Sequence, residues 1–320
     1  MTDANAPTPD PTTRWGIVAT VKAECDAILD FAAHHLALGA HRIHLFLDED
    51  NPEARAALAT RPRVQVTVCD DAHWARWDGR PEKHQARQTK NATFAYRRRP
   101  GVDWLAHIDV DEFLWPDRPI GEQLAALPDN VDVARVYPVE ALAPVDDSAH
   151  PGLWFKSYAR QQAMRRRQTA AIYPEFGPHL NGGFLSHVAG KVFIRTRIPK
   201  VNFRIHNGFV QGEQLSAETS LADTKLCHLH ARDFDHFLQA YRYRLARGSY
   251  RADLNLNALF SMLETEGGEA ALRRFYAEVC EASPALRARL ADHDHLHRID
   301  LDLAAKRARF FPQTASTVAK

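Results

Sequence analysis

The segment DWLAHIDVDEFLWP, Asp103 to Pro116, places three carboxylates directly after an apolar run. Two of them, Asp109 and Asp111, are separated by one residue, so a short turn after a strand can aim both at one point. Hard oxygen ligands of this kind suit Mg²⁺ or Mn²⁺. The spacing therefore predicts a divalent metal site at Asp109 and Asp111. In the alternative reading, one aspartate caps a helix near Pro119 and the other is solvated.

Glu112 is the third carboxylate of this segment, and its type allows two roles. It can act in the reaction by orienting a metal-bound water or a sugar hydroxyl, in which case it belongs to the catalytic residues. It can equally pair with a basic neighbour. The residues alone leave both roles open.

The segments before Asp103 predict the elements that position these acids. Apolar runs typical of strands alternate with helical patterns; the strands are expected at 14–21, 41–47, 63–69 and from 103, and the helices at 28–36, 51–59 and 82–98. Strand–helix alternation favours right-handed crossovers and a parallel sheet. We therefore expect an α/β fold with a Rossmann-like, mostly parallel central sheet flanked by helices.

Acidic residues follow three of the predicted strands, at 48–50, 70–71 and 109–112. Open α/β sheets bind ligands at the carboxyl ends of their strands. Because three strands bring carboxylates to the same edge, the pattern predicts a site for a metal ion, for hydroxyl groups, or for both.

The rest of the sequence indicates how the chain divides into a tail, a domain and a C-terminal portion. Residues 1–13 are polar and Pro-rich and are expected to form a disordered tail. Residues 14–232 are expected to form one domain. Residues 233–320 read as a helical C-terminal portion. The YPEFGPHLNGG run in the middle is expected to be a loop.

Composition narrows the class of partner. The 41 basic and 40 acidic residues leave a net charge of only +1, which argues against a nucleic-acid binder. No apolar run is long enough to span a bilayer and no export signal is apparent. The four cysteines form no CxxC pair. We expect a cytoplasmic protein, with peripheral membrane contact allowed.

Two stretches resemble a known enzyme family. VKAECDAILDFAAHHLALGAHRIHLFLDEDN is similar to the opening of a group of family 2-like glycosyltransferases, and DWLAHIDVDEFL is similar to their Asp-x-Asp signature. GKVFIRT, FRIHNG and LCHLHARDFDHFLQAYRYRLARG resemble later segments of the group more loosely. One departure is Ala23, where the group commonly has Asn. Another is YPEFGPHLNGG, which replaces a Ser-rich run.

The resemblance implies a GT-A fold over 14–232, with a nucleotide-binding half at about 14–115 and an acceptor half at about 116–232. It also implies a nucleotide-sugar donor, and Mn²⁺ or Mg²⁺ bound through Asp109 and Asp111. Residues at the matching positions are implied to contact the donor nucleotide, namely Thr20, Lys22, Glu24, Asp48, Asp50 and Asp109. Gln88, on the helix before the key strand, is also expected to face the nucleotide. Lys191 and the arginines at 165–167 are candidates for the diphosphate.

The resemblance also implies a late histidine in the metal shell. His228 is the first candidate, and His206 and His230 are the alternates. His34 and His35 on the first helix are expected to serve packing. An inverting enzyme further needs a carboxylate base near the acceptor hydroxyl. Glu175 is the candidate, with Glu213 and Glu218 as alternatives.

The expected function is a metal-dependent glycosyltransferase of hexosyltransferase type, which moves a sugar from a nucleotide-diphosphate donor to a glycan or lipid-linked acceptor. Two other classes remain open. A Mg²⁺-dependent phosphohydrolase or nucleotidyltransferase also uses aspartates at strand ends, although TVKAE after the first strand supplies neither a nucleophilic Asp nor a Gly-rich loop. The third class is a non-catalytic sugar-binding protein on a degenerate transferase scaffold.

Overall fold

The computed structural model describes residues 13–145, 152–247 and 254–312. Nearly all of the predicted tail therefore lies outside the described residues. The chain forms a mixed α/β fold with two compact units, each of them discontinuous in sequence. The first unit comprises Met1–Tyr137, Gly190–Lys225 and Leu303–Lys320, and the second comprises Pro138–Ala189 and Leu226–Asp302. The predicted domain at 14–232 and helical portion at 233–320 stay predictions.

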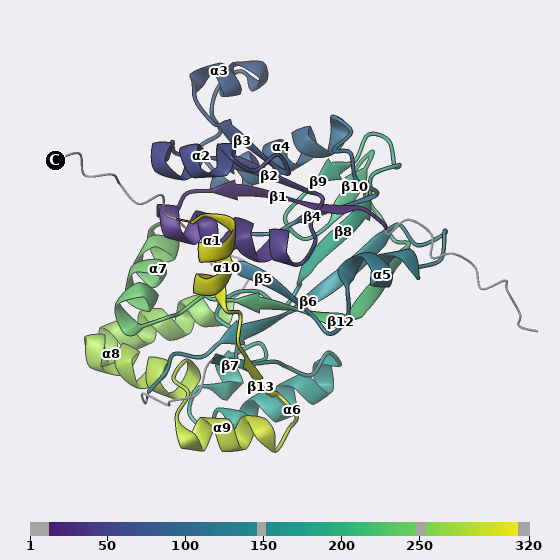
Figure 1. Ribbon diagram of the computed structural model, residues 1–320. Helices are drawn as coiled ribbons and strands as arrows, with labels where there is room; N and C mark the ends of the chain where they lie inside the picture. The colour runs from purple at the N-terminus through teal and green to yellow at the C-terminus, as the bar shows by residue number, and fades with distance from the viewer. Residues whose placement is uncertain (1–12, 146–151, 248–253, 313–320) are drawn as a thin grey trace, which may run out of the picture. The chain divides into compact units, whose positions relative to one another are not determined.

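Four parallel strands form the Rossmann-like part of the first unit (Figure 1). They are β1 (Trp15–Val21), β2 (Arg42–Leu47), β3 (Val64–Val68) and β4 (Trp104–His107), in the spatial order β3-β2-β1-β4. Every residue of β1 is buried, as expected for a strand with neighbours on both sides. The parallel pairing brings the carboxyl ends of these strands to one edge.

Helices connect the parallel strands as the sequence predicts. They are α1 (Cys25–Ala37), α2 (Pro52–Ala59), α3 (Asp71–Trp74), the 3₁₀ turn η1 (Ala75–Trp77) and α4 (His84–Arg97). The side chain of Asn51 accepts a hydrogen bond from the backbone N–H of Ala54, and Pro52 occupies the first helical turn, so α2 has a defined start. Asp70 caps α3 in the same way, through the N–H of His73.

The segment with the Asp-x-Asp pair is two strands rather than one. β4 ends at His107, and β5 (Glu112–Pro116) begins after a turn at residues 108–111. The N–H of Glu112 donates to the carbonyl of Asp109 at 3.1 Å, which closes the turn. Both aspartates therefore lie in a tight turn at the end of a core strand. The short helix α5 (Ile120–Ala125) follows, and no side chain caps it, so the capping role considered for one aspartate is absent.

Further strands extend the sheet, and β8 and β6 do so in the antiparallel sense. β8 (Lys191–Arg195) pairs with β4, and β6 (Val133–Ala141) pairs with β8. β12 (Glu218–His228) pairs with β5 and β6. A small separate sheet contains β9 (Asn202–Phe203), β10 (Gly208–Val210) and β11 (Glu213–Gln214). The expected parallel order therefore holds for β1 to β4, whereas the added strands make the sheet mixed.

The helix α10 (Leu303–Phe310) returns to the first unit and packs on α1, where Figure 1 shows it in yellow beside the purple helix. Arg307 forms ion pairs with Asp30 at 3.0 Å and with Asp26 at 3.2 Å. His34 of α1 contacts Lys306 of α10 and also forms a hydrogen bond with the carbonyl of Leu114 at 2.8 Å. The residues at the two ends of the described chain thus stabilise one another.

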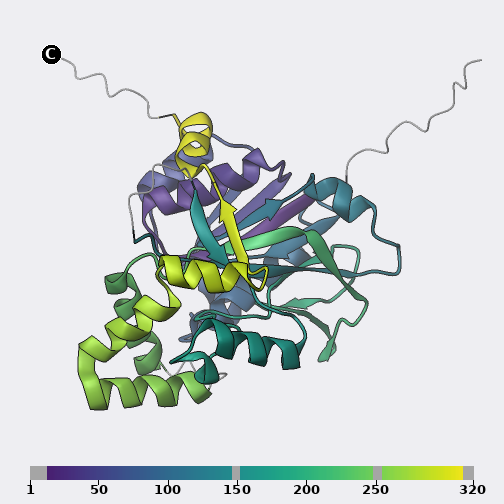
Figure 2. The same cartoon turned by 90° about the horizontal axis from the view of Figure 1, so that it is seen from below.

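The second unit has a small antiparallel sheet and most of the later helices. β7 (Leu153–Lys156) pairs with β13 (Leu296–Ile299) and with the end of β6. The helices are α6 (Gln162–Ile172), η2 (Gly177–His179), α7 (Phe234–Arg247), α8 (Leu254–Val279) and α9 (Pro284–Ala291). α8 bends at Gly268, whose φ of 56° is non-helical, and Figure 2 shows the bend in light green. β13 is a strand within the segment predicted as helical.

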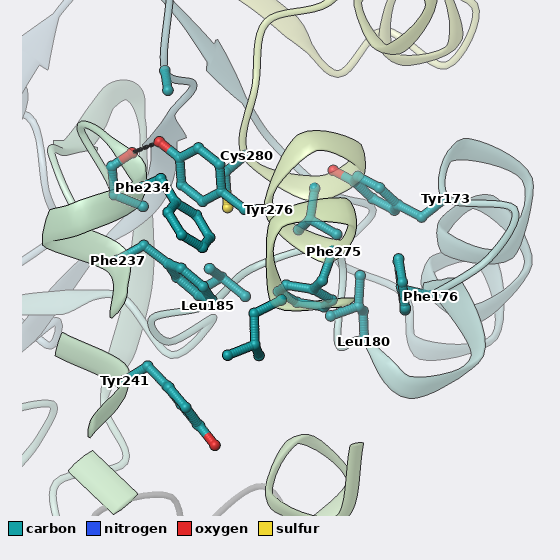
Figure 3. Close-up of a cluster of buried hydrophobic side chains, with 14 of the residues drawn as sticks. Tyr173, Phe176, Leu180, Leu185, Phe234, Phe237, Tyr241, Phe275, Tyr276 and Cys280 are labelled. Atoms are coloured by element: carbon teal, nitrogen blue, oxygen red, sulfur yellow. Dashed lines mark hydrogen bonds between the residues drawn. The ribbon is translucent and has the colours of Figure 1, made fainter. Parts of the chain in front are cut away.

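Aromatic residues dominate the core of the second unit (Figure 3). Phe275 is fully buried, and its ring lies 5.0 Å from the rings of Phe176 and Phe260. Tyr276 packs in the same cluster and donates its hydroxyl to the carbonyl of Ala231 at 3.1 Å. The aromatic pairs join helices α7 and α8 to the η2 turn. Among the described residues, no helix combines the length and apolar character needed to cross a bilayer.

Candidate active site

Asp109 is held on both sides by residues of the first unit. One carboxylate oxygen accepts a hydrogen bond from Gln88 Nε2 at 2.5 Å, and the other lies 2.5 Å from Lys191 Nζ. Gln88 comes from α4 and Lys191 is the first residue of β8. Two elements that are distant in sequence therefore fix the first aspartate of the Asp-x-Asp pair.

Glu112 is fully buried and belongs to the same cluster. Its Oε2 accepts the backbone N–H of Asp109 at 2.8 Å and lies 3.2 Å from Lys191 Nζ. One ammonium group thus contacts both carboxylates, and such pairing reduces the desolvation cost of burying an acid. Between the two roles considered for Glu112, these contacts favour pairing with a basic neighbour. They make Glu112 a positioning residue of the turn.

The charges of this cluster shift its pKa values in opposite directions. Burial would raise the pKa of Asp109, but the charge and hydrogen bond of Lys191, together with the charge of His107, lower it. Burial would lower the pKa of Lys191, but Asp109 and Glu112 raise it. Burial, with the charge of Lys191, lowers the pKa of the nearby His107 to about 4. At neutral pH the cluster therefore contains the ammonium of Lys191, the carboxylate of Asp109 and a neutral imidazole at His107.

Asp111 differs from Asp109 in its surroundings. It is half-buried in the turn, and Lys191 and Gln88 bond Asp109 instead. The carboxylate of Asp111 is among the groups close enough to others to hold a divalent ion. The groups that could hold a metal ion include the carboxylates of Asp111 and Glu112 in the first unit, and the imidazoles of His187, His228 and His230 in the second.

A pocket of about 380 Å³ lies at the carboxyl ends of β1 and β2. Its lining residues follow these two strands: Lys22, Ala23, Glu24, Glu49, Asp50 and Asn51. Three of the residues predicted to face the nucleoside, Lys22, Glu24 and Asp50, are among them. Lys22 and Glu49 form an exposed ion pair at 2.7 Å, so a ligand can displace this contact at little cost. Crevices at this position are where open α/β sheets bind ligands.

Asp48, another predicted nucleoside contact, is engaged inside the protein. Its carboxylate is almost fully buried and lies 2.8 Å from Arg87 Nη2 and 3.0 Å from Arg80. Burial would raise the pKa of Asp48, but bonds from His84 and Arg87 and the charges of Arg87 and Arg80 lower it. Asp48 therefore anchors α4 and the segment before it.

Thr20 and the buried end of α4 share a polar network. Asn91 Nδ2 donates to the hydroxyl of Thr20 at 3.1 Å, and Asn91 Oδ1 bonds His73 Nε2 at 2.8 Å. Cys69 Sγ is 3.5 Å from the same amide nitrogen. Thr20 is buried within β1 and its hydroxyl takes part in this network, and its contact with the nucleotide stays a prediction.

The candidate bases lie in different environments. Glu218 accepts two hydrogen bonds from the guanidinium of Arg135, at 2.5 and 2.7 Å, and is thereby held as an ion-pair partner. Glu213 is exposed on β11. Glu175 is exposed in the turn after α6, where its backbone N–H donates to Glu278. Glu175 as the base stays a prediction.

The candidate histidines divide between the units. His206 lies in the first unit and its Nδ1 bonds the carbonyl of Gly190 at 2.8 Å, directly before Lys191. His228 and His230 lie in the second unit, both are buried, and their ring centroids are 5.1 Å apart. His228 is the last residue of β12. The ring of His187, which the sequence reading did not single out, is 5.9 Å from that of His228.

Sequence reasoning missed how strongly α4 supports the site. Arg87, Gln88 and Asn91 all come from its inward face and bond Asp48, Asp109 and Thr20 respectively. Polar residues at spacings of three and four on a helix with a buried face were an available signal, since such residues must find partners. His187 had no local signal, because its neighbour His228 is 41 positions later.

Neither a protein-family model nor a curated protein matches this sequence. Among solved structures, the chain is similar to HddC from Yersinia pseudotuberculosis, with 9% identity and a TM-score of 0.34, over 65% of this chain and 90% of that chain. A likeness this low identifies neither a family nor a substrate.

Proposed function

We propose that this chain is a metal-dependent glycosyltransferase with a GT-A fold, of the family 2-like group, which uses a nucleotide-diphosphate sugar. The supporting observation is the Asp-x-Asp turn at the end of β4, the strand beside β1 in a parallel sheet. Lys191 and Gln88 fix Asp109 in that turn, and the turn is tied by Glu112. An acidic turn that is only a solvated part of the surface would not need the three buried partners Gln88, Glu112 and Lys191.

The pocket at the ends of β1 and β2 supports the donor nucleoside as the ligand. It lies on the same edge of the sheet to which β4 delivers the Asp-x-Asp turn, because β1, β2 and β4 are parallel. In the proposal, Lys22, Glu24 and Asp50 contact the nucleoside, and its diphosphate extends toward the turn. Asp111 carries the divalent ion, which offsets the charge that develops on the diphosphate leaving group.

Lys191 would act beside the diphosphate in this proposal. Its ammonium stays charged at neutral pH because two carboxylates raise its pKa. A fixed positive charge in a buried cluster stabilises a nearby anion more than a solvated one does. The acceptor, a glycan or a lipid-linked sugar, would deliver its hydroxyl to a carboxylate base, for which Glu175 remains the candidate.

The proposal is tested by a thermal-shift screen of nucleoside diphosphates and nucleotide-sugars, with and without Mn²⁺. We expect one nucleotide to raise the Tm only with the metal, and Asp111→Asn to abolish that increase. Asp129→Asn is the matched control, because the side chain of Asp129 is 98% exposed and remote in sequence from the turn. A folded wild-type chain that responds to no nucleotide under any metal condition contradicts the proposal.

A further inference from the structure

A basic and aromatic surface runs along one side of α4 in the first unit. Trp77 of η1 and Phe94 of α4 are half-buried, and their ring centroids lie 5.6 Å apart. The guanidinium of Arg76 lies 5.3 Å from the Trp77 ring and 4.6 Å from the Phe94 ring. Lys90 Nζ lies 5.7 Å from the Trp77 ring, and the guanidinium of Arg98 lies 4.9 Å from the Phe94 ring. We call these five residues the cationic α4 surface.

The spacing along α4 separates this surface from the buried side of the helix. Lys90, Phe94 and Arg98 follow one another at intervals of four positions, so their side chains lie on one face. The buried residues Gln88 and Asn91 lie on another face. The rings hold the three cations in place through cation–π contacts, which lowers the entropy that they lose when a ligand binds.

The three cations carry positive charge that the protein itself does not offset. Among the described residues they form no ion pair, although Asp78 and Glu82 lie close to them in sequence. Arg76 and Arg98 are exposed. The segment 83–102 contains six basic residues and no acidic one. A surface of this kind attracts an anionic partner.

We propose that the cationic α4 surface binds an anionic phospholipid bilayer, so that the chain attaches to one face of a membrane. Lys and Arg are attracted to the negative surface of such bilayers, and Trp is enriched at the level of the lipid headgroups. The cationic α4 surface presents both kinds of side chain together. Nucleic acid also attracts cations, but the balance of 41 basic against 40 acidic residues in the whole chain disfavours it.

This inference deepens the proposed function, on which its catalytic meaning rests, by favouring a lipid-linked acceptor over a free glycan. α4 carries the cationic surface on one face and Gln88 on another, and Gln88 bonds Asp109 of the Asp-x-Asp turn. Gln88 and Phe94 are six residues apart, which is about 9 Å along the axis of a helix. Attachment through α4 therefore keeps the turn near the bilayer, where a lipid-linked sugar is held.

The experiment measures co-sedimentation of the full chain with lipid vesicles. We expect binding to vesicles of phosphatidylcholine mixed with phosphatidylglycerol, and none to vesicles of phosphatidylcholine alone. Because salt screens charge interactions, raising NaCl from about 0.1 M to about 0.5 M should release the bound chain. These measurements on the wild-type chain require no variant to fold.

The double variant Arg76→Gln/Arg98→Gln tests whether this surface makes the contact. Each basic residue near an anionic bilayer contributes about fivefold to the partition coefficient, so we expect a loss of roughly 25-fold. Arg118→Gln/Arg309→Gln is the matched control, because it removes two exposed arginines of the same unit, and Arg309 also stacks on a ring, that of Phe310. Its partition coefficient should equal that of the wild type.

The inference is overturned if the chain does not bind anionic vesicles, if it binds neutral vesicles equally well, or if the two double variants lose equal affinity. Tighter binding to double-stranded DNA or RNA than to anionic vesicles, at the same phosphate concentration, also overturns it and assigns the surface to nucleic acid. If vesicles bind through this surface while the nucleotide screen fails, only the proposed function falls. If a nucleotide binds with Mn²⁺ and anionic vesicles do not bind the chain, only this inference falls.

Discussion

Lys191 Nζ lies 2.5 Å from Asp109 Oδ2 and 3.2 Å from Glu112 Oε2, so a single buried ammonium holds two carboxylates. Removing it leaves both acids without their cation. We expect Lys191→Met to lower the free energy of unfolding by about 3–5 kcal/mol, as measured by urea denaturation. Adding Glu112→Gln should recover part of the loss, since one negative charge is then removed.

Lys22→Met is the control for this prediction. Lys22 pairs with Glu49 at 2.7 Å, yet both side chains are about two-thirds exposed. An exposed pair contributes less than about 1 kcal/mol. Equal losses from the two lysine variants would show that the Lys191 cluster is solvated, contrary to its burial.

The Arg87–Asp48 pair predicts an acid-dependent stability. Because the folded-state pKa of Asp48 is lowered, its contribution is present above the unfolded value of about 3.9 and is lost as pH falls below it. We expect Arg87→Met to cost about 2–3 kcal/mol at pH 7 and less at pH 3. The measurement is the free energy of unfolding at each pH. Arg80→Met should cost clearly less, because Arg80 is 46% exposed.

His44 on β2 predicts a second pH effect with the same sign. Burial, and then the charge of Arg42, lowers the pKa of His44 to about 4. Between pH 4 and 6.5 the unfolded chain binds more protons than the folded one, so stability rises with pH across that window. In the wild type we expect the free energy of unfolding to rise by about 2–3 kcal/mol across this window, and in His44→Leu we expect this rise to disappear. If His44→Leu keeps the full dependence of the free energy of unfolding on pH, groups other than His44 cause that dependence.

Gly183 predicts a steric effect in the second unit. A Cβ at this residue would lie 2.3 to 2.4 Å from the ring and hydroxyl of Tyr173, and the φ of +78° is already unfavourable for other residues. Gly212 has a φ of +93° but nothing within 4 Å of its Cβ position. We expect Gly212→Ala to cost about 1 kcal/mol through strain alone, and Gly183→Ala to cost at least twice as much. Equal Tm losses would contradict this account.

The fold of the first unit was largely predictable because its apolar runs are continuous and its helix signals are local. β1, β2 and β3 and helices α1, α2 and α4 lie where the periodicity predicts them. The break between β4 and β5 was not visible, because Ile108 and Val110 continue the apolar pattern through the turn. β12 was missed since Glu218 to His228 contains Glu, Asp, Lys and Thr as well as apolar residues.

The candidate site was predictable in its carboxylates and not in their partners. Asp109 and Asp111 stand out locally, but Lys191 reaches Asp109 from 82 positions away, through antiparallel pairing of β8 with β4. Asp48 and Thr20 are predicted as ligand contacts because they lie near strand ends. Their partners Arg87 and Asn91 come from α4, and no pattern in the sequence specifies which strand end a helix residue will reach.

The packing of α10 on α1 has a consequence for how the protein is made. Arg307 leaves the ribosome 277 residues after Asp30, its ion-pair partner. During synthesis the parallel strands can form early, while the side of α1 that α10 covers stays exposed until α10 has been synthesised. Contacts of such long sequence separation form late. A nascent chain halted before residue 303 would therefore expose that side of α1 to chaperones, even with the pocket at the ends of β1 and β2 already formed.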